Sequence, residues 1–167
     1  MRSVAVWALA AVLALAGGCR KKGNEHELYG LFGLKFGERV TEAMGRKVGD
    51  DPRGTAEIWE VTAPEPMRHL TKYTAYVRKG DRRIWGLKGE AECANYLEAR
   101  AKLFEVKADL EIMMRYHMDS RTSPDHFAVR FANATSPSRG TLALRAEPGP
   151  PTARVTLFAL DEANLPK

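Results

Sequence analysis

The residues best suited to chemistry stand close together between His117 and His126. Ser123, Asp125 and His126 are the residue types of a hydrolase triad. Triad members are assembled by the fold rather than by adjacency in sequence, and no nucleophile-elbow motif accompanies these three. We therefore expect Ser123 and Asp125 to act in a turn, with His126 at a strand edge, and we assign no catalytic residue.

The same stretch also contains residues that commonly bind metals. His117, Asp119, Asp125 and His126 lie at the end of a predicted helix, in the loop after it and at the start of a predicted strand. The sequence has no His-Glu-x-x-His, no paired Cys-x-x-Cys and no calcium-loop pattern. We therefore predict no metal site and no cofactor, and interpret these four residues as solvated loop and capping groups.

Aromatic residues are the other candidate functional feature. Trp59, Tyr73, Tyr76 and Trp85 lie on three adjacent predicted strands. Because successive side chains of a strand point to opposite faces, some of the four should lie in the core and others on the open face of a sheet. An exposed aromatic patch would mark a binding surface, and the alternative is that all four complete the core.

The N-terminus has the pattern of a secretory signal peptide over residues 1–18. Met1-Arg2-Ser3 precedes thirteen apolar residues, and Gly17-Gly18-Cys19 follows them. A basic start, a short apolar run and small residues at the exit are typical of such leaders. Thirteen helical residues span only about 20 Å against roughly 30 Å of hydrocarbon, so the run is too short for a transmembrane helix.

The end of the leader, Leu15-Ala16-Gly17-Gly18-Cys19, resembles the lipobox of bacterial lipoproteins. It departs from the usual box in having Ala16 three residues before the cysteine, with Leu15 one step earlier. The resemblance implies cleavage before Cys19 and acylation of its thiol. The resemblance also implies that Arg20, in place of the aspartate that retains lipoproteins in the inner membrane of enteric bacteria, directs the protein to the outer membrane of a Gram-negative cell. The alternative is cleavage after Ala16, which would release a soluble protein.

Residues 19–27 then form the lipidated cysteine and a basic tether, in which Arg20, Lys21 and Lys22 would favour anionic headgroups. Net charge is +5, and removing Arg2 with the leader leaves 5 − 1 = +4. The remaining domain is close to neutral, so we predict no nucleic-acid partner. Cys93, the only other cysteine, is expected to be buried on a helix.

Residues 28–167 should form a single domain. With 44% hydrophobic and 28% charged residues, the chain is neither disordered nor a polytopic membrane protein. The pattern predicts the order β-α-β-β-β-α-β-β-β, with a short helix over Glu38–Lys47 and a long helix from Glu92 to about His117, of which Glu92–Met114 should carry the helical half of the core. The stripe expected to pack the long helix onto the sheet is Cys93, Leu97, Ala101, Phe104 and Ala108.

Strands are predicted over residues 28–37, 55–62, 72–78, 82–88, 127–131, 142–144 and 155–159, with Lys79-Gly80-Asp81 as a hairpin loop. Because most strands follow one another through short turns, we expect an α+β two-layer sandwich, with a mostly antiparallel sheet and both helices on one face.

These observations predict a lipid-anchored cell-envelope lipoprotein with a small non-enzymatic interaction or assembly domain. Its expected partners are the membrane, through acylated Cys19, and another protein of the envelope. The alternatives are an envelope hydrolase that uses the His117–His126 region, and a carrier with an apolar cavity between sheet and helix.

Overall fold

The computed structural model describes residues 27–118, 120–133, 138–149 and 151–166, so the leader, Cys19 and most of the tether lie outside the described residues. Within them, eight strands form one antiparallel sheet in the order β3-β4-β5-β6-β10-β9-β8-β7, and β1 and β2 form a separate small hairpin. The elements are β1 (Gly30–Leu31), β2 (Leu34–Lys35), β3 (Gly45–Asp50), β4 (Ala56–Val61), β5 (Lys72–Arg78), β6 (Ile84–Cys93), α2 (Tyr96–Met114), β7 (Ser120–Ser123), β8 (His126–Ala132), β9 (Arg139–Glu147), β10 (Ala153–Asp161) and the 3₁₀ turn η1 (Glu162–Asn164).

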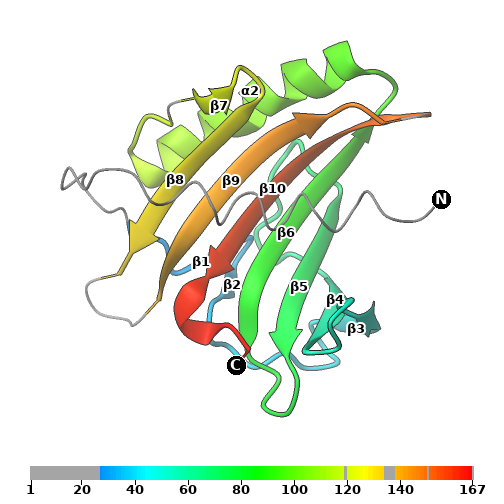
Figure 1. Ribbon diagram of the computed structural model, residues 1–167, viewed down its shortest axis with the longest axis vertical. Helices are drawn as coiled ribbons and strands as arrows, with labels where there is room; N and C mark the ends of the chain where they lie inside the picture. The colour runs from blue at the N-terminus through cyan, green and yellow to red at the C-terminus, as the bar shows by residue number, and fades with distance from the viewer. Residues whose placement is uncertain (1–26, 119, 134–137, 150, 167) are drawn as a thin grey trace.

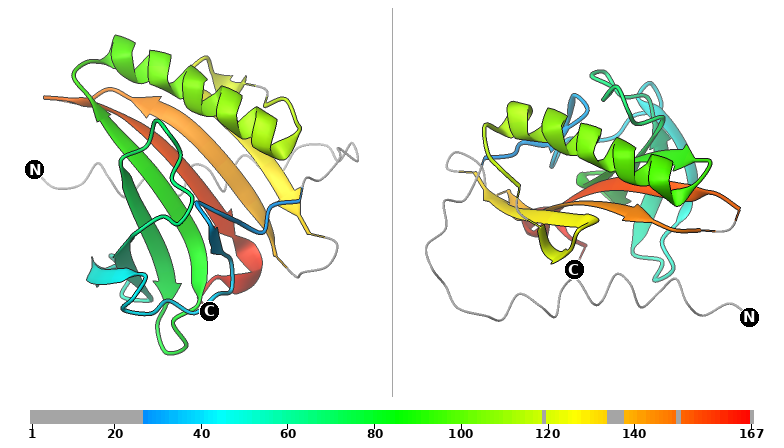
Figure 2. Two further views of the ribbon diagram at one scale, coloured as in Figure 1. Left: turned by 180° about the vertical axis from the view of Figure 1, so that it is seen from behind. Right: turned by 90° about the horizontal axis from the view of Figure 1, so that it is seen from above.

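The molecule has two layers, as expected for the α+β class. α2 lies across one face of the twisted sheet and contacts β9, β10 and β6, while no helix formed by the described residues covers the opposite face of these strands (Figures 1 and 2). The antiparallel sheet with a long helix on one face confirms the predicted fold class.

The centre of the sheet is the pairing of β6 with β10, which are neighbours in space but separated by α2 and three strands in the chain. Their antiparallel register runs from Cys93 opposite Ala153 to Gly86 opposite Leu160. This ladder joins the β3-to-β6 meander to the β7-to-β10 meander. The sheet is therefore continuous, and one core serves the whole domain.

The β5–β6 hairpin agrees with the sequence analysis. β5 has the predicted bounds, and Gly80 takes the positive φ of 95° that glycine tolerates best. Asp81 accepts hydrogen bonds from the Arg78 side chain (Nε–Oδ1 3.0 Å) and from the Arg83 backbone N–H (3.2 Å). The Asp81 carboxylate therefore joins the residues on the two sides of the loop, Arg78 before it and Arg83 after it.

The core lies between the sheet and α2. It is built from alternate strand residues such as Leu87, Leu144 and Leu157, which have no exposed surface. From α2 it takes Ala99, Leu103, Val106 and Leu110, which are equally inaccessible. Removing apolar surface from water in this way supplies roughly 25 cal/mol for each Å² and is the main stabilising contribution.

The predicted packing face of the long helix is wrong. Leu97 is 77% exposed and Phe104 45% exposed, and Ala101 and Ala108 also face solvent. The helix is apolar on two opposite faces, so spacing predicted a stripe correctly but could not say which of the two stripes is buried.

The start of the helix was also misplaced. The chain stays in β6 through Cys93, and the helix begins at Tyr96 after the N-cap Asn95. The Asn95 side chain accepts from the Glu98 N–H (2.9 Å), and the Glu98 carboxylate accepts from the Ala94 N–H (2.9 Å). Asn-x-x-Glu is a capping signal that can be recognised in the sequence, and it places the start of the helix at Tyr96, four residues after the predicted start at Glu92.

The predicted short helix over Glu38–Lys47 does not form. Residues 38–40 pair with the chain at the start of β6: Arg39 bridges to Arg83, the Val40 N–H donates to the Arg82 carbonyl (2.9 Å) and the Ile84 N–H to the Glu38 carbonyl (2.9 Å). Val40 is buried in this position, and β3 begins at Gly45. In this segment, backbone hydrogen bonds to a strand distant in sequence are more favourable than a short helix, which is only marginally stable by itself.

Two further differences concern short strands. The predicted strand over residues 28–37 is the tight β1–β2 hairpin, which turns at Phe32 and Gly33 with positive φ angles of 60° and 79°. The predicted loop over residues 119–125 contains β7, an edge strand paired with β8. All three strands, β1, β2 and β7, are too short for alternation of apolar and polar residues to reveal them.

The corrected helix face makes a stability prediction at adjacent residues. Leu103→Ala should lower the free energy of unfolding by about 2–5 kcal/mol because it opens a cavity under α2. Phe104→Ala should cost about 1 kcal/mol or less because the ring is half exposed, although it contacts Phe127 at a centroid distance of 6.0 Å. Urea unfolding followed by circular dichroism measures both, and a larger loss for Phe104→Ala would contradict the packing described here.

Candidate functional site

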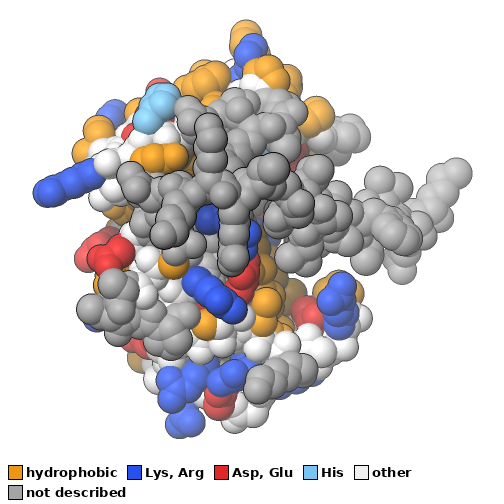
Figure 3. Space-filling view, turned by 60° about the vertical axis from the view of Figure 1, so that its left-hand side comes forward, with side chains coloured by type: hydrophobic (Ala, Val, Ile, Leu, Met, Phe, Trp, Pro, Cys, Tyr) orange, Lys and Arg blue, Asp and Glu red, His pale blue; other side chains and the backbone are white. Residues whose placement is uncertain are grey.

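The outer face of α2 is the main apolar feature of the described surface. We call Leu97, Ala101, Phe104, Ala108 and Ile112 the α2 stripe. They recur at intervals of four, three, four and four residues and therefore form one line along the helix. Leu97 and Ile112, near the two ends, are 77% and 78% exposed. Figure 3 shows hydrophobic side chains exposed at the top of the molecule, where α2 lies, and Lys and Arg side chains gathered at its lower end.

Charged side chains of opposite sign border the α2 stripe. On the side of β8, Arg100 Nε lies 2.7 Å from Asp125 Oδ1, and Lys107 lies over the ring of Phe127 at 5.1 Å. On the side of the loop before β5, Glu105 lies 3.2 Å from His69 Nδ1. The β8 border is thus basic at Arg100 and Lys107, with Glu111 beside Lys107 as its one helix carboxylate, and the β5 border is acidic at Glu105.

The four predicted surface aromatics are divided between the two faces of the sheet. Trp59 and Tyr73 are buried on the core face, where Tyr73 Oη donates to the backbone carbonyls of Met67 (3.1 Å) and Leu70 (3.0 Å). Trp59 donates from its indole nitrogen to Glu57 (2.9 Å). These two residues are held by the core and offer no surface for a partner.

Tyr76 and Trp85 lie on the other face of the sheet. The ring of Tyr76 is 5.5 Å from that of Trp85 and 5.5 Å from that of Phe158. Trp85 is itself buried, and its indole nitrogen has no hydrogen-bond acceptor among the described residues. The three rings cover one another, so this cluster is small and mostly self-contained.

Salt bridges occupy much of the open face around these rings. Lys88 and Arg154 lie 2.9 Å and 3.4 Å from the carboxylate of Glu90, and Arg145 lies 3.0 Å from Glu147. The open sheet face therefore has a mixed, charged character, and the apolar surface sought in the sequence lies on the helix instead.

The candidate ionisable cluster does not assemble among the residues that can be described. His117 lies beyond the C-terminal end of α2, where its Nδ1 is 2.9 Å from Glu111. Asp125 lies near the other end of the helix and accepts from the Tyr96 hydroxyl at 2.6 Å. Asp119 lies outside the described residues. His126 is paired through its backbone with Arg145 and with Ser123.

The electrostatics of these groups are those of structural contacts. The hydrogen bond from Tyr96, followed by that from Arg100, holds the pKa of Asp125 below its usual range. Burial lowers the pKa of His126. Across the described ranges, no three His, Cys, Asp or Glu side chains converge in a way that could hold a metal ion.

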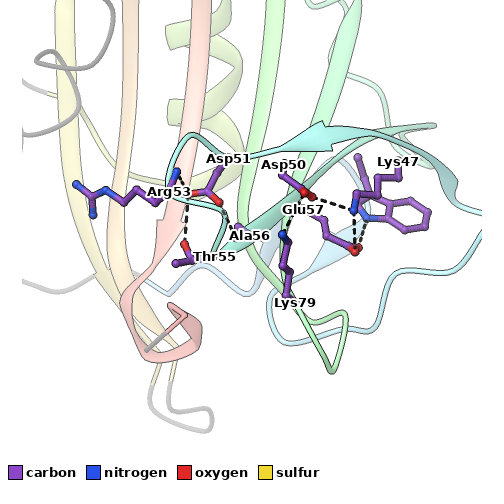
Figure 4. Close-up of polar contacts among 9 residues, drawn as sticks. Lys47, Asp50, Asp51, Arg53, Thr55, Ala56, Glu57 and Lys79 are labelled. Carbon is purple, nitrogen blue, oxygen red and sulfur yellow. Dashed lines mark hydrogen bonds and ion pairs between the residues drawn. The ribbon is translucent and has the colours of Figure 1, made fainter.

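A second group of charges joins the β3–β4 and β5–β6 hairpins. Lys47 lies 2.8 Å from Asp50 and 3.1 Å from Glu57, and Lys79 lies 3.0 Å from Asp50 (Figure 4). These contacts lower the pKa of Asp50, with Lys47 as the largest cause, and the Trp59 indole lowers that of Glu57. The lysines neutralise both carboxylates, and the Lys79–Asp50 pair joins the β5–β6 hairpin to the β3–β4 hairpin.

Two hollows in the described surface are open depressions of about 400 and about 410 Å³. Charged residues contribute to both, including Arg39, Asp81 and Arg82 in the first and Arg46 and Glu60 in the second. An apolar carrier would need an enclosed apolar cavity, and neither hollow has that character.

Comparison with known protein families, with curated proteins and with solved structures finds no match for this chain. Among the residues placed by the structure, no helix combines the length and the apolar character needed to cross a bilayer.

The Asp81 loop contact generates a pH prediction. The bonds from Arg78 lower the pKa of Asp81 from 3.8 to about 2 in the folded protein. A depressed folded-state pKa adds stability above the unfolded value, and that stability is lost as the pH falls toward the folded value. Wild type should therefore be more stable than Asp81→Asn at pH 6, and the difference should shrink between about pH 4 and pH 2.

Denaturant unfolding of both proteins at stepped pH measures this difference. Asp109→Asn, a carboxylate on α2 outside the hairpin, serves as the control. A stability difference for Asp81→Asn that stays constant down to pH 2 would contradict the assigned ion pair.

Proposed function

We propose that this protein is a lipid-anchored component of the cell envelope, and that its domain is a non-enzymatic interaction module with the α2 stripe as its docking surface. The observation that carries the proposal is the exposure of Leu97, Phe104 and Ile112 in one line on a helix that already buries its opposite face. A contiguous apolar line bordered by charge is typical of a protein-binding surface.

The anchor in this proposal comes from the sequence. The lipobox-like segment ending at Cys19 implies acylation, and two or more acyl chains hold a protein stably on a membrane. Arg20 directly after the cysteine favours the outer membrane, facing the periplasm, and another envelope protein is then the natural partner class.

The packing of the ionisable residues supports an interaction role over a hydrolase. Asp125 is already committed to Tyr96 and Arg100, and His117 lies by Glu111 on the far end of the helix. Asp125 and His117 therefore lie near opposite ends of a 19-residue helix, too far apart to act together on one substrate. The open, charged hollows give the carrier hypothesis no support either.

The anchor can be tested on the full chain produced in a bacterium that processes lipoproteins. Mass spectrometry of the N-terminal peptide should find an acylated Cys19, and Cys19→Ala should move the protein from the membrane to the soluble fraction. An unmodified N-terminus at Gly17 would overturn this part of the proposal.

The docking surface needs a separate test with a matched control. Ile112→Glu places a charge in the α2 stripe, whereas Val48→Glu places one at an exposed β-branched residue on β3. After chemical cross-linking of intact envelopes, adducts of this protein should be strongly reduced by Ile112→Glu and retained by Val48→Glu, with both variants still anchored. Equal adduct yields in the two variants would contradict the assignment of the stripe.

A further inference from the structure

We infer that the α2 stripe docks a second copy of this chain, with the two α2 helices parallel about a two-fold axis that runs along them. This inference rests on the proposed function, which makes the stripe a docking surface, and it goes further by naming the occupant and its orientation. Three features support it: the sign of charge on each border, the place where the described chain begins, and the small residues within the stripe.

The two borders of the stripe differ in the sign of their net charge. The β8 border carries Arg100 and Lys107 with one carboxylate, Glu111, and the β5 border carries Glu98, Glu105 and Asp109 with one lysine, Lys102. Arg100 lies on the β8 border, as its contact with Asp125 shows, and Glu105 lies on the β5 border, as its contact with His69 shows. Glu98 is on the same side of the helix as Glu105, seven residues or two turns earlier. Arg100, Glu98 and Glu105 all remain exposed despite their contacts within the chain.

This arrangement selects one orientation of a self-complementary pair. When two copies meet through their stripes, a two-fold axis parallel to the helices places the basic border of each against the acidic border of the other. An axis perpendicular to the helices places like charges together, which is unfavourable. In the parallel pair, Arg100 of each copy comes beside Glu105 of the other, five residues further along, which is the usual spacing of charge pairs between parallel helices.

The same charges argue against a lipid surface as the occupant. α2 carries the carboxylates Glu98, Glu105, Asp109 and Glu111 against three basic side chains, Arg100, Lys102 and Lys107. Helices that lie on membranes are rich in Lys and Arg around their apolar face, because bilayer surfaces are commonly anionic. The acidic border of α2 fits a basic protein surface better, and the second copy provides one.

The start of the described chain is compatible with this orientation. Leu28 is held by Asn133, just after β8, through hydrogen bonds of 2.7 and 2.8 Å. The first described residues, in blue, lie beside the C-terminal end of α2 in both views of Figure 2. In a parallel pair both chains therefore begin at the same end of the dimer. A Cys19 eight residues before Glu27 reaches at most about 29 Å, so both anchors can enter one membrane.

The two alanines of the α2 stripe have small side chains that allow two helices to approach closely, and they are suitable positions for a cysteine cross-linking experiment. Ala101 and Ala108 lie seven residues apart, about 10.5 Å along the helix. With the two-fold axis parallel to the helices, each residue of the stripe lies opposite the same residue of the second copy. A cysteine at either position can therefore come within the distance needed for a disulfide. About a perpendicular axis, at most one of the two positions can do so.

The full chain should be produced with Ala101→Cys, Ala108→Cys or, as an exposed control on η1, Ala163→Cys, and membranes should be oxidised mildly. Cys93 is buried with a raised thiol pKa, so it should contribute little background. Both helix variants should form about tenfold more disulfide-linked dimer than the control, because docking raises the local thiol concentration.

Charge reversal tests the cause of the orientation in the same assay. In the Ala101→Cys background, Arg100→Glu or Glu105→Arg should each reduce the dimer, and the two together should restore it, because the pair is re-formed with its signs exchanged. Circular dichroism shows whether each variant keeps its fold. Restoration by the double variant distinguishes a contact between copies from simple damage to α2.

The inference would be overturned if neither helix variant forms more disulfide-linked dimer than the control, or if only one of the two positions does so. It would also be overturned if the double charge variant is folded but does not restore the dimer. A disulfide adduct with a different protein, formed without dimer, would also overturn it but would leave the proposed docking function standing. Loss of the anchor in the Cys19 experiment would affect the proposed function alone, since the cross-link can form without a membrane.

Discussion

The pairing of β6 with β10 is the constraint on which the rest of this structure depends. It joins two antiparallel meanders that would otherwise be separate sheets, and it extends β6 to Cys93, opposite Ala153. The helix cap at Asn95 follows two residues later. With so little chain between strand and helix, α2 has to turn back over the sheet at once, and its orientation on β9, β10 and β6 is set by that exit.

This orientation explains the unusual distribution of apolar residues on α2. The inner face is complete, because Ala99, Leu103, Val106 and Leu110 leave no exposed surface. The outer face has a second apolar line that the domain itself does not cover. The charged side chains beside that line keep the helix compatible with water. Because the net charge differs in sign between the two sides of the line, the two sides can be told apart by a partner. A helix with one polar face would have stabilised the domain equally well, so the outer line calls for an explanation outside the domain.

The ionisable residues, by contrast, are mostly used within the fold. Asp81 closes the β5–β6 loop, Asp50 links two hairpins through lysines, and Asp125 ties the start of β8 to the start of α2. Each carboxylate has a cation or hydroxyl at hydrogen-bond distance, which stabilises its charged form. These three carboxylates therefore hold elements of the fold together, which is consistent with the interaction role proposed for the domain.

The sequence alone determined the features that depend on neighbouring residues. The Lys79-Gly80-Asp81 hairpin, the bounds of β5 and the presence of a long helix all follow from local turn chemistry and periodicity. The lipobox-like segment at Cys19 is equally local, and it remains a prediction about residues outside those described. The α+β class followed from the order of such elements.

Tertiary structure decided what periodicity leaves open. Spacing cannot say whether Leu97 or Leu103 faces the sheet, since the two stripes of α2 have equal period and differ only in their partners. Residues 38–40 do not form a helix because the chain at the start of β6 offers their backbone hydrogen bonds, which no local pattern reveals. Which of the four aromatic residues join the main core follows from which sheet face the core covers, and Tyr73 there contacts the ring of Phe32. Burial is a property of contacts between distant segments, and those contacts exist only once the β6–β10 ladder has brought both halves of the chain together.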